Sequence, residues 1–299
     1  MHEIWYKYAA KRRRSATTFG TILVAMLSMG TLPLPASADN NYFESLAARS
    51  EVIYARSYRK QSEIDADVPT RPENRETPPV YDPVVDGARW TVHPGNGGIV
   101  TKDQMRPHFP HTSTGSLLFY WEARWDKNFP YELSTMHTHK AFQLSRDTSG
   151  DQRRIEIRTR FNLASAPDVA EVDGRSYIWS PEETPMSHQV GKFTIKGDTW
   201  TRFWAYVDFD RRRFSLWVAD EKTSPKEIYR DYQFNDMTGG LDNFWFEFNS
   251  SQSRAGGAAL NIWARNFVVL RNVGNVEALI EQGGKVAAAP EAPRNVAVR

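Results

Sequence analysis

The chain has 299 residues, a formal net charge of +2 and no cysteine. This length allows one large domain or two small ones, and the lack of cysteine excludes disulfides, thiolate metal sites and cysteine nucleophiles. With 40% hydrophobic and 13% aromatic residues, the sequence can build a substantial core.

Residues 1–38 have the three parts of a secretory signal peptide. A basic segment (7–14) precedes an apolar run (19–34), and Ala36-Ser37-Ala38 is a small-residue cleavage pattern. The alternative is an uncleaved membrane anchor, but two prolines interrupt the region and the run falls short of the roughly 20 apolar residues that a spanning helix needs. We therefore predict a protein exported to the periplasm or the medium, with cleavage near Ala38.

Removal of the signal changes the charge of the chain. Residues 1–38 hold five Lys or Arg and one Glu, so the remaining chain has a net charge of −2. The basic character belongs to the signal, and the mature protein loses the electrostatic argument for binding nucleic acid or an anionic membrane.

Between the signal and the main domain we expect an extension over residues 39–86. Its first part, 39–67, has apolar residues loosely at helical spacing and predicts a short helix. Its second part, 68–86, is rich in proline and charge and predicts an extended linker.

Residues 87–273 consist of short strand-like runs separated by clusters of Gly, Pro, Asn and Asp. This spacing, without a long helical period, predicts an all-β fold of two antiparallel sheets, a jelly-roll sandwich. Four of the runs are rich in aromatic residues: 116–125, 154–161, 201–209 and 243–249. After one helical turn at 276–280, we expect residues 274–299 to form a flexible tail.

Alternation along these runs divides the side chains into an apolar face and a polar, aromatic face. The predicted core residues are Phe119, Trp121, Ile157, Phe203, Val207, Phe246 and Phe248. The predicted outward residues are Tyr120, Glu122, Arg158, Arg160, Tyr206, Trp245 and Glu247. Flat rings stack on the apolar faces of sugars, and charged groups bind hydroxyls or uronate carboxylates, so this mixture favours a polysaccharide as the partner.

Several segments in order resemble the jelly-roll domains of the concanavalin-like lectin/glucanase superfamily, of the polysaccharide-lyase type found in alginate and glucuronan lyases. They are Leu118–Trp125, His139–Leu144, Ile155–Phe161, Trp200–Val207, Phe214–Asp220, Gly240–Ser251 and Trp263–Arg271. The resemblance covers about residues 88–273 and implies a two-sheet jelly roll with a sugar-binding groove. The Glu-x-Asp-x-x-Glu signature of its glycoside hydrolases is absent. An Arg-x-Glu-Leu-Arg lyase signature is echoed in Arg154-Ile-Glu-Ile-Arg158, and a Gln-Ile-His signature in His139 with Gln143.

A lyase needs a cation or amide to neutralise the uronate carboxylate, a base to remove the adjacent proton, and an acid for the leaving oxygen. We predict Lys140, Arg158, Tyr206 and His139 as the catalytic residues. The predicted substrate-binding residues are Gln143, Arg160, Trp204, Trp245, Glu247 and Asn249.

Other interpretations of the same residues stay open. The strand arginines could form ordinary ion pairs with Glu122, Glu156 and Glu247. The chain could be a non-catalytic, lectin-like binding module, or a hydrolase that uses Glu156 and Glu247.

No cofactor is required by these interpretations. His137 and His139 could form a metal pair, but a third zinc ligand is not evident. Structural calcium could be held by Asp236, Asp242 or loop carbonyls. The expected partner is an acidic polysaccharide, bound by a monomer.

Overall fold

The computed structural model describes residues 38–68, 78–92, 104–127, 138–145, 154–161, 170–175, 193, 195–233, 240–247 and 260–287. Strands at 138–145, 154–161 and 170–175 are described by their backbone and register. The predicted signal peptide lies outside the described residues, apart from Ala38. No helix in the described part of the chain is long and apolar enough to cross a membrane.

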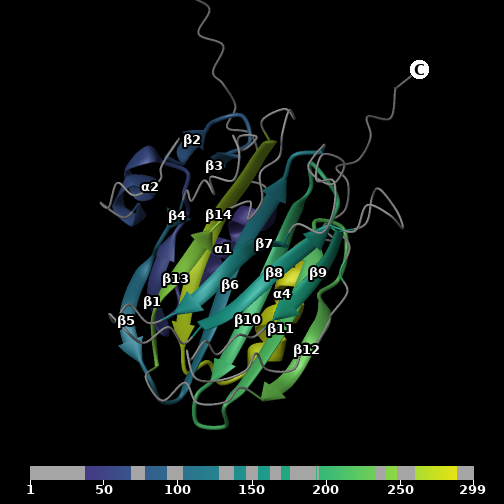
Figure 1. Cartoon of the computed structure of the whole chain (residues 1–299). Helices are drawn as coiled ribbons and strands as arrows, with labels where there is room; N and C mark the ends of the chain where they lie inside the picture. The colour runs from purple at the N-terminus through teal and green to yellow at the C-terminus, as the bar shows by residue number, and fades with distance from the viewer. Residues whose placement is uncertain are drawn as a thin grey trace, which may run out of the picture. The chain divides into compact units, whose positions relative to one another are not determined.

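The described strands form two antiparallel sheets, which confirms the predicted sandwich (Figure 1). The large sheet has the order β12-β11-β10-β6-β14-β3-β2, and β1 also pairs with β14. Its strands are β1 (Val52–Arg56), β2 (Val80–Asp82), β3 (Gly87–Val92), β6 (Ser116–Trp125), β10 (Trp200–Asp208), β11 (Arg213–Asp220), β12 (Lys226–Gln233) and β14 (Leu260–Arg271). The predicted runs at 116–125 and 201–209 thus become β6 and β10.

The small sheet has the order β4-β13-β7-β8-β9, with β5 also paired to β13. Its strands are β4 (Gln104–Met105), β5 (His108–Thr112), β7 (Thr138–Ser145), β8 (Arg154–Phe161), β9 (Ala170–Arg175) and β13 (Leu241–Glu247). The other two predicted runs, at 154–161 and 243–249, correspond to β8 and β13.

The main core lies between the sheets and is largely aromatic. Trp121 stacks on Phe203 with ring centroids 5.0 Å apart, and Phe244 meets the edge of Trp121 at 5.1 Å. The predicted core residues Phe119, Trp121, Phe203, Val207 and Phe246 are all buried in this cluster. The side chain of Ile157 and all of Phe248 lie outside the described residues.

A second apolar cluster lies on the other face of the large sheet. Helices α1 (Ala38–Ala47) and α4 (Val276–Ala287) cover this face, behind the large sheet in Figure 1. Tyr120 and Glu122 point outward from β6 as predicted, but both are fully buried because this face is covered. The prediction of a single helical turn near residue 276 was too short, since α4 spans 12 residues.

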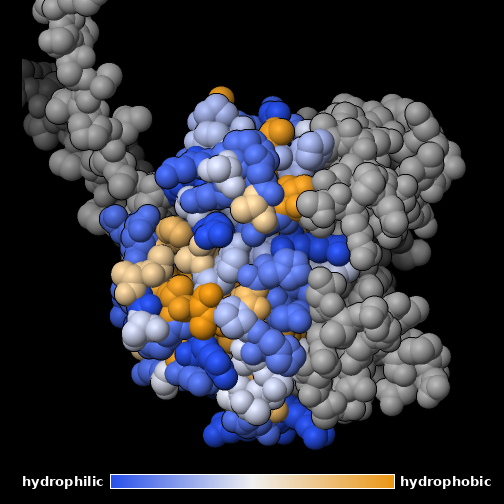
Figure 2. Space-filling view, turned by 90° about the vertical axis from the view of Figure 1, so that its left-hand side faces the viewer, coloured by the Kyte–Doolittle hydropathy of each residue, from blue (hydrophilic) through white to orange (hydrophobic). Residues whose placement is uncertain are grey.

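The extension also departs from the single helix predicted over 39–67. It forms α1, then β1, then α2 (Gln61–Asp67). A bulge in β14 between Arg265 and Val268 separates the part that pairs with β3 from the part that pairs with β1. The side of the molecule that carries β1, β5 and α2 is mostly hydrophilic, with small apolar areas (Figure 2). The extension thus closes one edge of the sandwich.

A polar contact fixes the helices to the sheet, and it gives a first testable prediction. The Tyr42 hydroxyl donates to the Leu279 carbonyl at 2.7 Å and accepts from Trp204 Nε1 at 3.0 Å. Tyr42→Phe leaves both groups buried without this partner, so we expect the free energy of unfolding to fall by about 1–3 kcal/mol. Urea denaturation measures this loss; an unchanged midpoint would show that the two bonds contribute nothing net.

Candidate functional site

The two outer faces of the sandwich differ in what covers them. On the large sheet, α1 and α4 bury the outer face. On the small sheet, β7 and β8 lie nearest the viewer in Figure 1, and none of the helices in the described ranges lies over them. Among the described residues, the large sheet therefore presents its covering helices rather than its own outer face.

Three adjacent strands of the small sheet, β13, β7 and β8, carry most of the predicted site residues. They are Trp245 and Glu247 on β13, His139, Lys140 and Gln143 on β7, and Arg158 and Arg160 on β8. These residues come from three separate segments of the sequence, and the sheet brings their backbones side by side.

The strand register aligns these positions further. Gln143 lies directly opposite Trp245 on one side and Glu156 on the other, while Lys140 lies opposite Arg158. A register shift between Lys140 and Phe142 makes this possible. Residues 140 and 143 are three positions apart, so in a regular strand they would belong to opposite faces of the sheet. Their partners on β8, residues 158 and 156, are only two positions apart, as expected when a bulge inserts one extra residue into β7.

Trp245 is the best-described residue of this face. It lies between Phe244 and Phe246, which are both buried in the main core, so its own side chain points outward. The ring is half-buried, and the Arg106 guanidinium lies over it, with Cζ 3.7 Å from the ring centroid. The expected stacking platform thus carries a cation on its ring.

Arg106 was not among the residues predicted from sequence. It follows β4, which pairs with β13 through Met105 and Phe246. The signal that could have revealed it is the alternation of buried Met105, Pro107 and Phe109 with more exposed Arg106 and His108. The segment is short and contains proline, so its strand character is weak in the sequence.

A cluster of hydroxyl groups around Asp67 lies next to Arg106. The Arg106 N–H donates to the Asp67 carbonyl at 2.7 Å. The Asp67 carboxylate accepts hydrogen bonds from the hydroxyls of Tyr54 and Tyr58. Burial raises the pKa of the Asp67 carboxyl above its ordinary value of 3.8, although both hydrogen bonds act to lower it.

This raised pKa predicts a dependence of stability on pH. The folded protein binds the Asp67 proton more tightly than the unfolded chain does. The resulting stabilisation is therefore complete below pH 3.8 and is lost as pH rises through the folded pKa. Compared with Asp67→Asn, which cannot ionise, the wild type should lose more stability between about pH 4 and about pH 7. Urea denaturation across this range checks the slope, with exposed Asp65→Asn on the same helix as control; parallel curves for wild type and Asp67→Asn would contradict it.

Two predicted site residues lie on β10, in the other sheet, and the structure corrects both. Trp204 is fully buried beneath α1 and α4, so it cannot stack on a sugar. Tyr206 is half-buried on the same helix-covered face, where it lines a cavity of about 500 Å³ with Arg211 and Val276. Alternation identified their face correctly but did not reveal that helices cover it.

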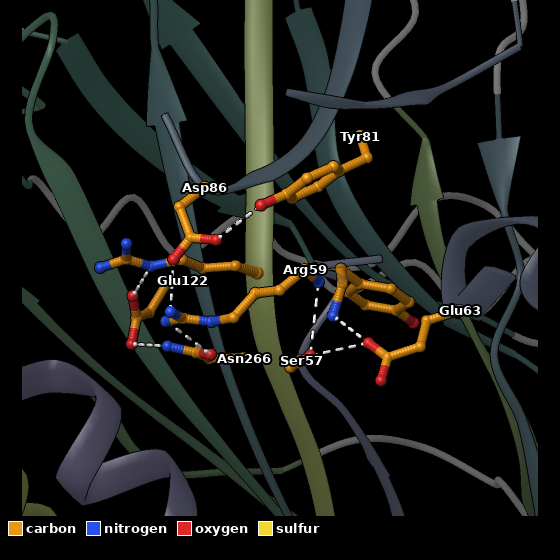
Figure 3. A network of polar contacts seen from close by, with 9 residues as sticks. Ser57, Arg59, Glu63, Tyr81, Asp86, Glu122 and Asn266 are labelled. Atoms are coloured by element: carbon orange, nitrogen blue, oxygen red, sulfur yellow. Dashed lines mark hydrogen bonds and ion pairs between the residues drawn. The ribbon is translucent and has the colours of Figure 1, made fainter. Parts of the chain in front are cut away.

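Glu122 also belongs to a different environment from the one predicted. Its carboxylate accepts from Asn266 Nδ2 at 2.8 Å (Figure 3). It also accepts from Arg265 Nε at 2.6 Å and from the Tyr120 hydroxyl at 2.6 Å. Arg59 joins Asn266 to Asp86 in the same network. Glu122 is fully buried, and its hydrogen bonds tie β6 to β14 within the large sheet.

The remaining predictions concern ions and residues beyond the described ranges. Asn249, Asp236 and His137 lie outside them. The Asp242 carboxylate faces His111 at 3.9 Å. Within the ranges that the structure describes, no group of three or more His, Asp or Glu is arranged to hold a metal ion.

Comparisons with known proteins give likenesses of fold only. No family model matches the chain, and no curated protein matches its sequence. Among solved structures, alginate lyase Aly36B has a TM-score of 0.45 at 12% identity, over 74% of this chain and 94% of that one. Alginate lyase vAL-1 from Chlorella virus has a TM-score of 0.45 at 11% identity, over 74% and 99%. A glycoside hydrolase family 131 catalytic domain from Coprinopsis cinerea has a TM-score of 0.40 at 11% identity, over 76% and 99%.

Proposed function

We propose that the protein is an exported polysaccharide lyase that cleaves a uronate-containing polymer by β-elimination on the outer face of the small sheet. The observation that carries this proposal is the register of β13, β7 and β8, which aligns Trp245 with Gln143 and Lys140 with Arg158. These are an aromatic ring, an amide and two cations, the groups expected to bind a sugar acid.

The outer face can be followed from Trp245 across the three strands by their register. Residues directly opposite each other in an antiparallel pair share a face. Trp245 points outward, so its partner Gln143 and the next partner, Glu156, belong to the same face. Arg158 is two residues from Glu156 and joins this face by alternation, and Lys140 joins it as the partner of Arg158.

Two adjacent cations on this face suit the first step of elimination. They would neutralise the uronate carboxylate, so that the proton on the neighbouring carbon becomes acidic and the enolate-like intermediate is stabilised. Each arginine has an acidic residue as its register partner on β9, Asp173 opposite Arg158 and Glu171 opposite Arg160. An ordinary cross-strand ion pair is therefore the alternative role of both arginines.

The proton acceptor is one of the histidines that precede Lys140, His137 or His139, because Lys140 must stay protonated to neutralise the carboxylate. A histidine base gives a kcat/KM that rises with pH near neutrality, and a pH profile without this rise would contradict the assignment. Tyr206 has no part in this step, because its strand lies in the large sheet.

In the lectin-like alternative, the same face binds the polymer without cleaving it. The half-buried Trp245, with the Arg106 guanidinium over its ring, favours this alternative. The hydrolase alternative requires Glu156 and Glu247 to act together. Their strands are separated by β7, so the two backbones are roughly 10 Å apart at an interstrand spacing of about 4.8 Å. The strand spacing does not fix the distance between the two carboxylates, and that distance would decide between retention and inversion.

Absorbance of unsaturated uronates, with alginate, glucuronan and pectate as substrates, tests the proposal. Elimination creates a double bond conjugated to the carboxylate, so absorbance rises steadily with at least one of the three polymers. Binding to a uronate polymer without this rise would replace the lyase by the lectin-like protein. New reducing ends without the rise would replace it by a hydrolase.

A further inference from the structure

Two cavities lie between α4 and the strands β11 and β12, on the helix-covered face of the large sheet. Their volumes are about 440 and about 500 Å³, within the range of roughly 300–1,000 Å³ that is usual for small-ligand sites. Trp217, Arg230 and Glu277 line both of them. The two cavities are therefore neighbouring parts of one cleft, which we name the α4 cleft.

A bulge in β12 directs two polar side chains in succession into this cleft. The register of β11 and β12 shifts between Phe214 and Leu216, so that Ser215 lies opposite two residues, Arg230 and Asp231. Asp231 has a positive φ of 49°, and its N–H donates to Ser215 Oγ at 2.9 Å. Both Arg230 and Asp231 line the larger cavity. In a regular strand, only one of the two would face the cleft.

The larger cavity also offers polar groups to a ligand. The half-buried side chain of Tyr206 lines it beside Asp231. Within the part of the chain that the structure describes, neither the Tyr206 hydroxyl nor the Asp231 carboxylate has a hydrogen-bond partner. A hydroxyl that donates and accepts and a carboxylate that accepts thus line one cavity, and both can bind a ligand rich in hydroxyl groups.

The charges around the larger cavity favour a neutral ligand. Arg230 Nη2 lies 2.6 Å from Glu227 Oε2 and 3.8 Å from Glu277 Oε1. Arg211 pairs with Asp208 at 3.8 Å. Each cation therefore already has a carboxylate nearby, and an anionic ligand would be repelled by these carboxylates. A neutral hydroxyl can accept from a guanidinium and donate to a carboxylate at the same time.

The cleft has an apolar wall opposite its charged rim. Trp217 lines both cavities and is otherwise packed among the residues beneath α1 and α4. Val273 and Val276 line the larger cavity, and Pro225 and Ile280 line the smaller one. An apolar wall with a few placed polar groups is typical of small-ligand sites. It also matches a sugar ring, which has apolar C–H faces and a rim of hydroxyls.

We propose that the α4 cleft is a second carbohydrate-binding site, which binds neutral sugar units of a polysaccharide without cleaving them. Tyr206, Arg230 and Asp231 bind the hydroxyls, and the apolar wall contacts the C–H face of the ring. The site is independent of the proposed lyase activity, because it belongs to the large sheet and α4, whereas Lys140 and Arg158 belong to the small sheet.

Calorimetric titration of the full chain with β-1,4-linked tetrasaccharides of glucose, mannose and xylose tests this site. We expect at least one of these neutral probes to bind the wild type. Tyr206→Phe removes only a hydroxyl and should weaken binding of the best probe by about 2- to 10-fold. Arg230→Gln removes charge-assisted donors and should weaken it by about 10-fold or more.

Gly274→Phe blocks the cleft without removing a polar group. Gly274 lines the larger cavity, a Cβ at this position would have no other atom within 4 Å, and its φ is not positive. The ring should therefore occupy the cavity in a folded protein and abolish binding. Val84→Phe is the matched control, since Val84 is 90% exposed beside β2, at the opposite edge of the large sheet from β12. Thermal unfolding checks that both variants are folded.

The outcomes separate this inference from the lyase proposal. If the wild type yields no unsaturated product but binds a neutral probe that Gly274→Phe excludes, the lyase fails and the α4 cleft stands. If the wild type cleaves a uronate polymer but binds none of the neutral probes, the lyase stands and the cleft fails.

Two further results would overturn the inference. Binding that survives Gly274→Phe and is lost in Trp245→Ala would place the neutral sugar on the small sheet. Tighter binding of a mannuronate tetrasaccharide than of every neutral probe, lost in Gly274→Phe and measured with Lys140→Ala as the background, would contradict the selection of neutral units.

Discussion

Glu122→Ala is expected to lower the free energy of unfolding by about 3–5 kcal/mol, the loss typical when one partner of a buried ion pair is removed. Both oxygens of Glu122 are hydrogen-bonded, and the side chains of Glu122 and Arg265 are 0% and 7% exposed. Alanine leaves the Arg265 guanidinium without its counter-charge in a site that water does not reach. Urea denaturation followed by tryptophan fluorescence measures the loss.

Two controls isolate the charge. Glu122→Gln keeps the size of the side chain and a carbonyl acceptor, so it should cost less than alanine while still leaving Arg265 unneutralised. Glu51→Gln removes a partner of Arg49 from a partly exposed pair at 2.5 Å and should change stability little, because surface pairs contribute little. If Glu122→Ala and Glu51→Gln have equal effects, the buried network is not a stabilising element.

Lys140→Ala is expected to lower kcat by about 10²- to 10³-fold, the effect typical of removing one preorganised group that stabilises developing charge. The thermal midpoint should stay within a few degrees of the wild-type value, since a strand lysine on the outer face supports little packing. Rates of unsaturated-product formation give the first quantity, and thermal unfolding gives the second.

Lys196→Ala is the control for this variant. Its side chain is 57% exposed, and its ammonium group pairs with Asp220 at 3.3 Å. Turnover should stay at the wild-type level. If Lys140→Ala unfolds the domain, Lys140 has a structural role. If the variant keeps full activity, Lys140 is not part of the catalytic site. If the protein binds without catalysing, Trp245→Ala should abolish binding, because stacking on a sugar needs the ring.

The core of the sandwich could be predicted from sequence because alternation carries the information. In the run at 243–249, every second residue from 244 is phenylalanine, and Phe244 and Phe246, which lie in β13, are buried between the sheets. The same reasoning placed Trp121 and Phe203, which stack on each other. Alternation depends only on the strand itself, so it needs no knowledge of its partners.

What covers each outer face could not be predicted in this way. The sequence pattern predicts Trp204 and Glu122 on an exposed outer face of the large sheet. Helices α1 and α4, which come from opposite ends of the domain sequence, bury this face. The length of α4 was underestimated because Gly283 and Gly284 lower its helix propensity. The fold requires glycine at 283, where a Cβ would lie 2.7 Å from the Trp204 ring and 2.8 Å from the Tyr42 ring.

The candidate site was predictable in its residue types and not in its alignment. Lys140, Gln143 and Arg158 stand out as polar residues in strand-like runs. Their alignment depends on the bulge between Lys140 and Phe142, which is defined by the neighbouring strand and leaves no mark on β7 alone. Arg106 and Trp245 are far apart in the sequence, and only the pairing of β4 with β13 brings them together.

The mass of the fragments released from a defined uronate hexasaccharide tests the central claim most directly. Elimination breaks the glycosidic bond without consuming water, so the fragment with the new non-reducing end should be one water lighter than a saturated oligosaccharide of the same length. This lighter fragment, absent with Lys140→Ala, is the predicted result. Saturated fragments whose masses together exceed that of the substrate by one water would contradict the account, because hydrolysis would then be the reaction.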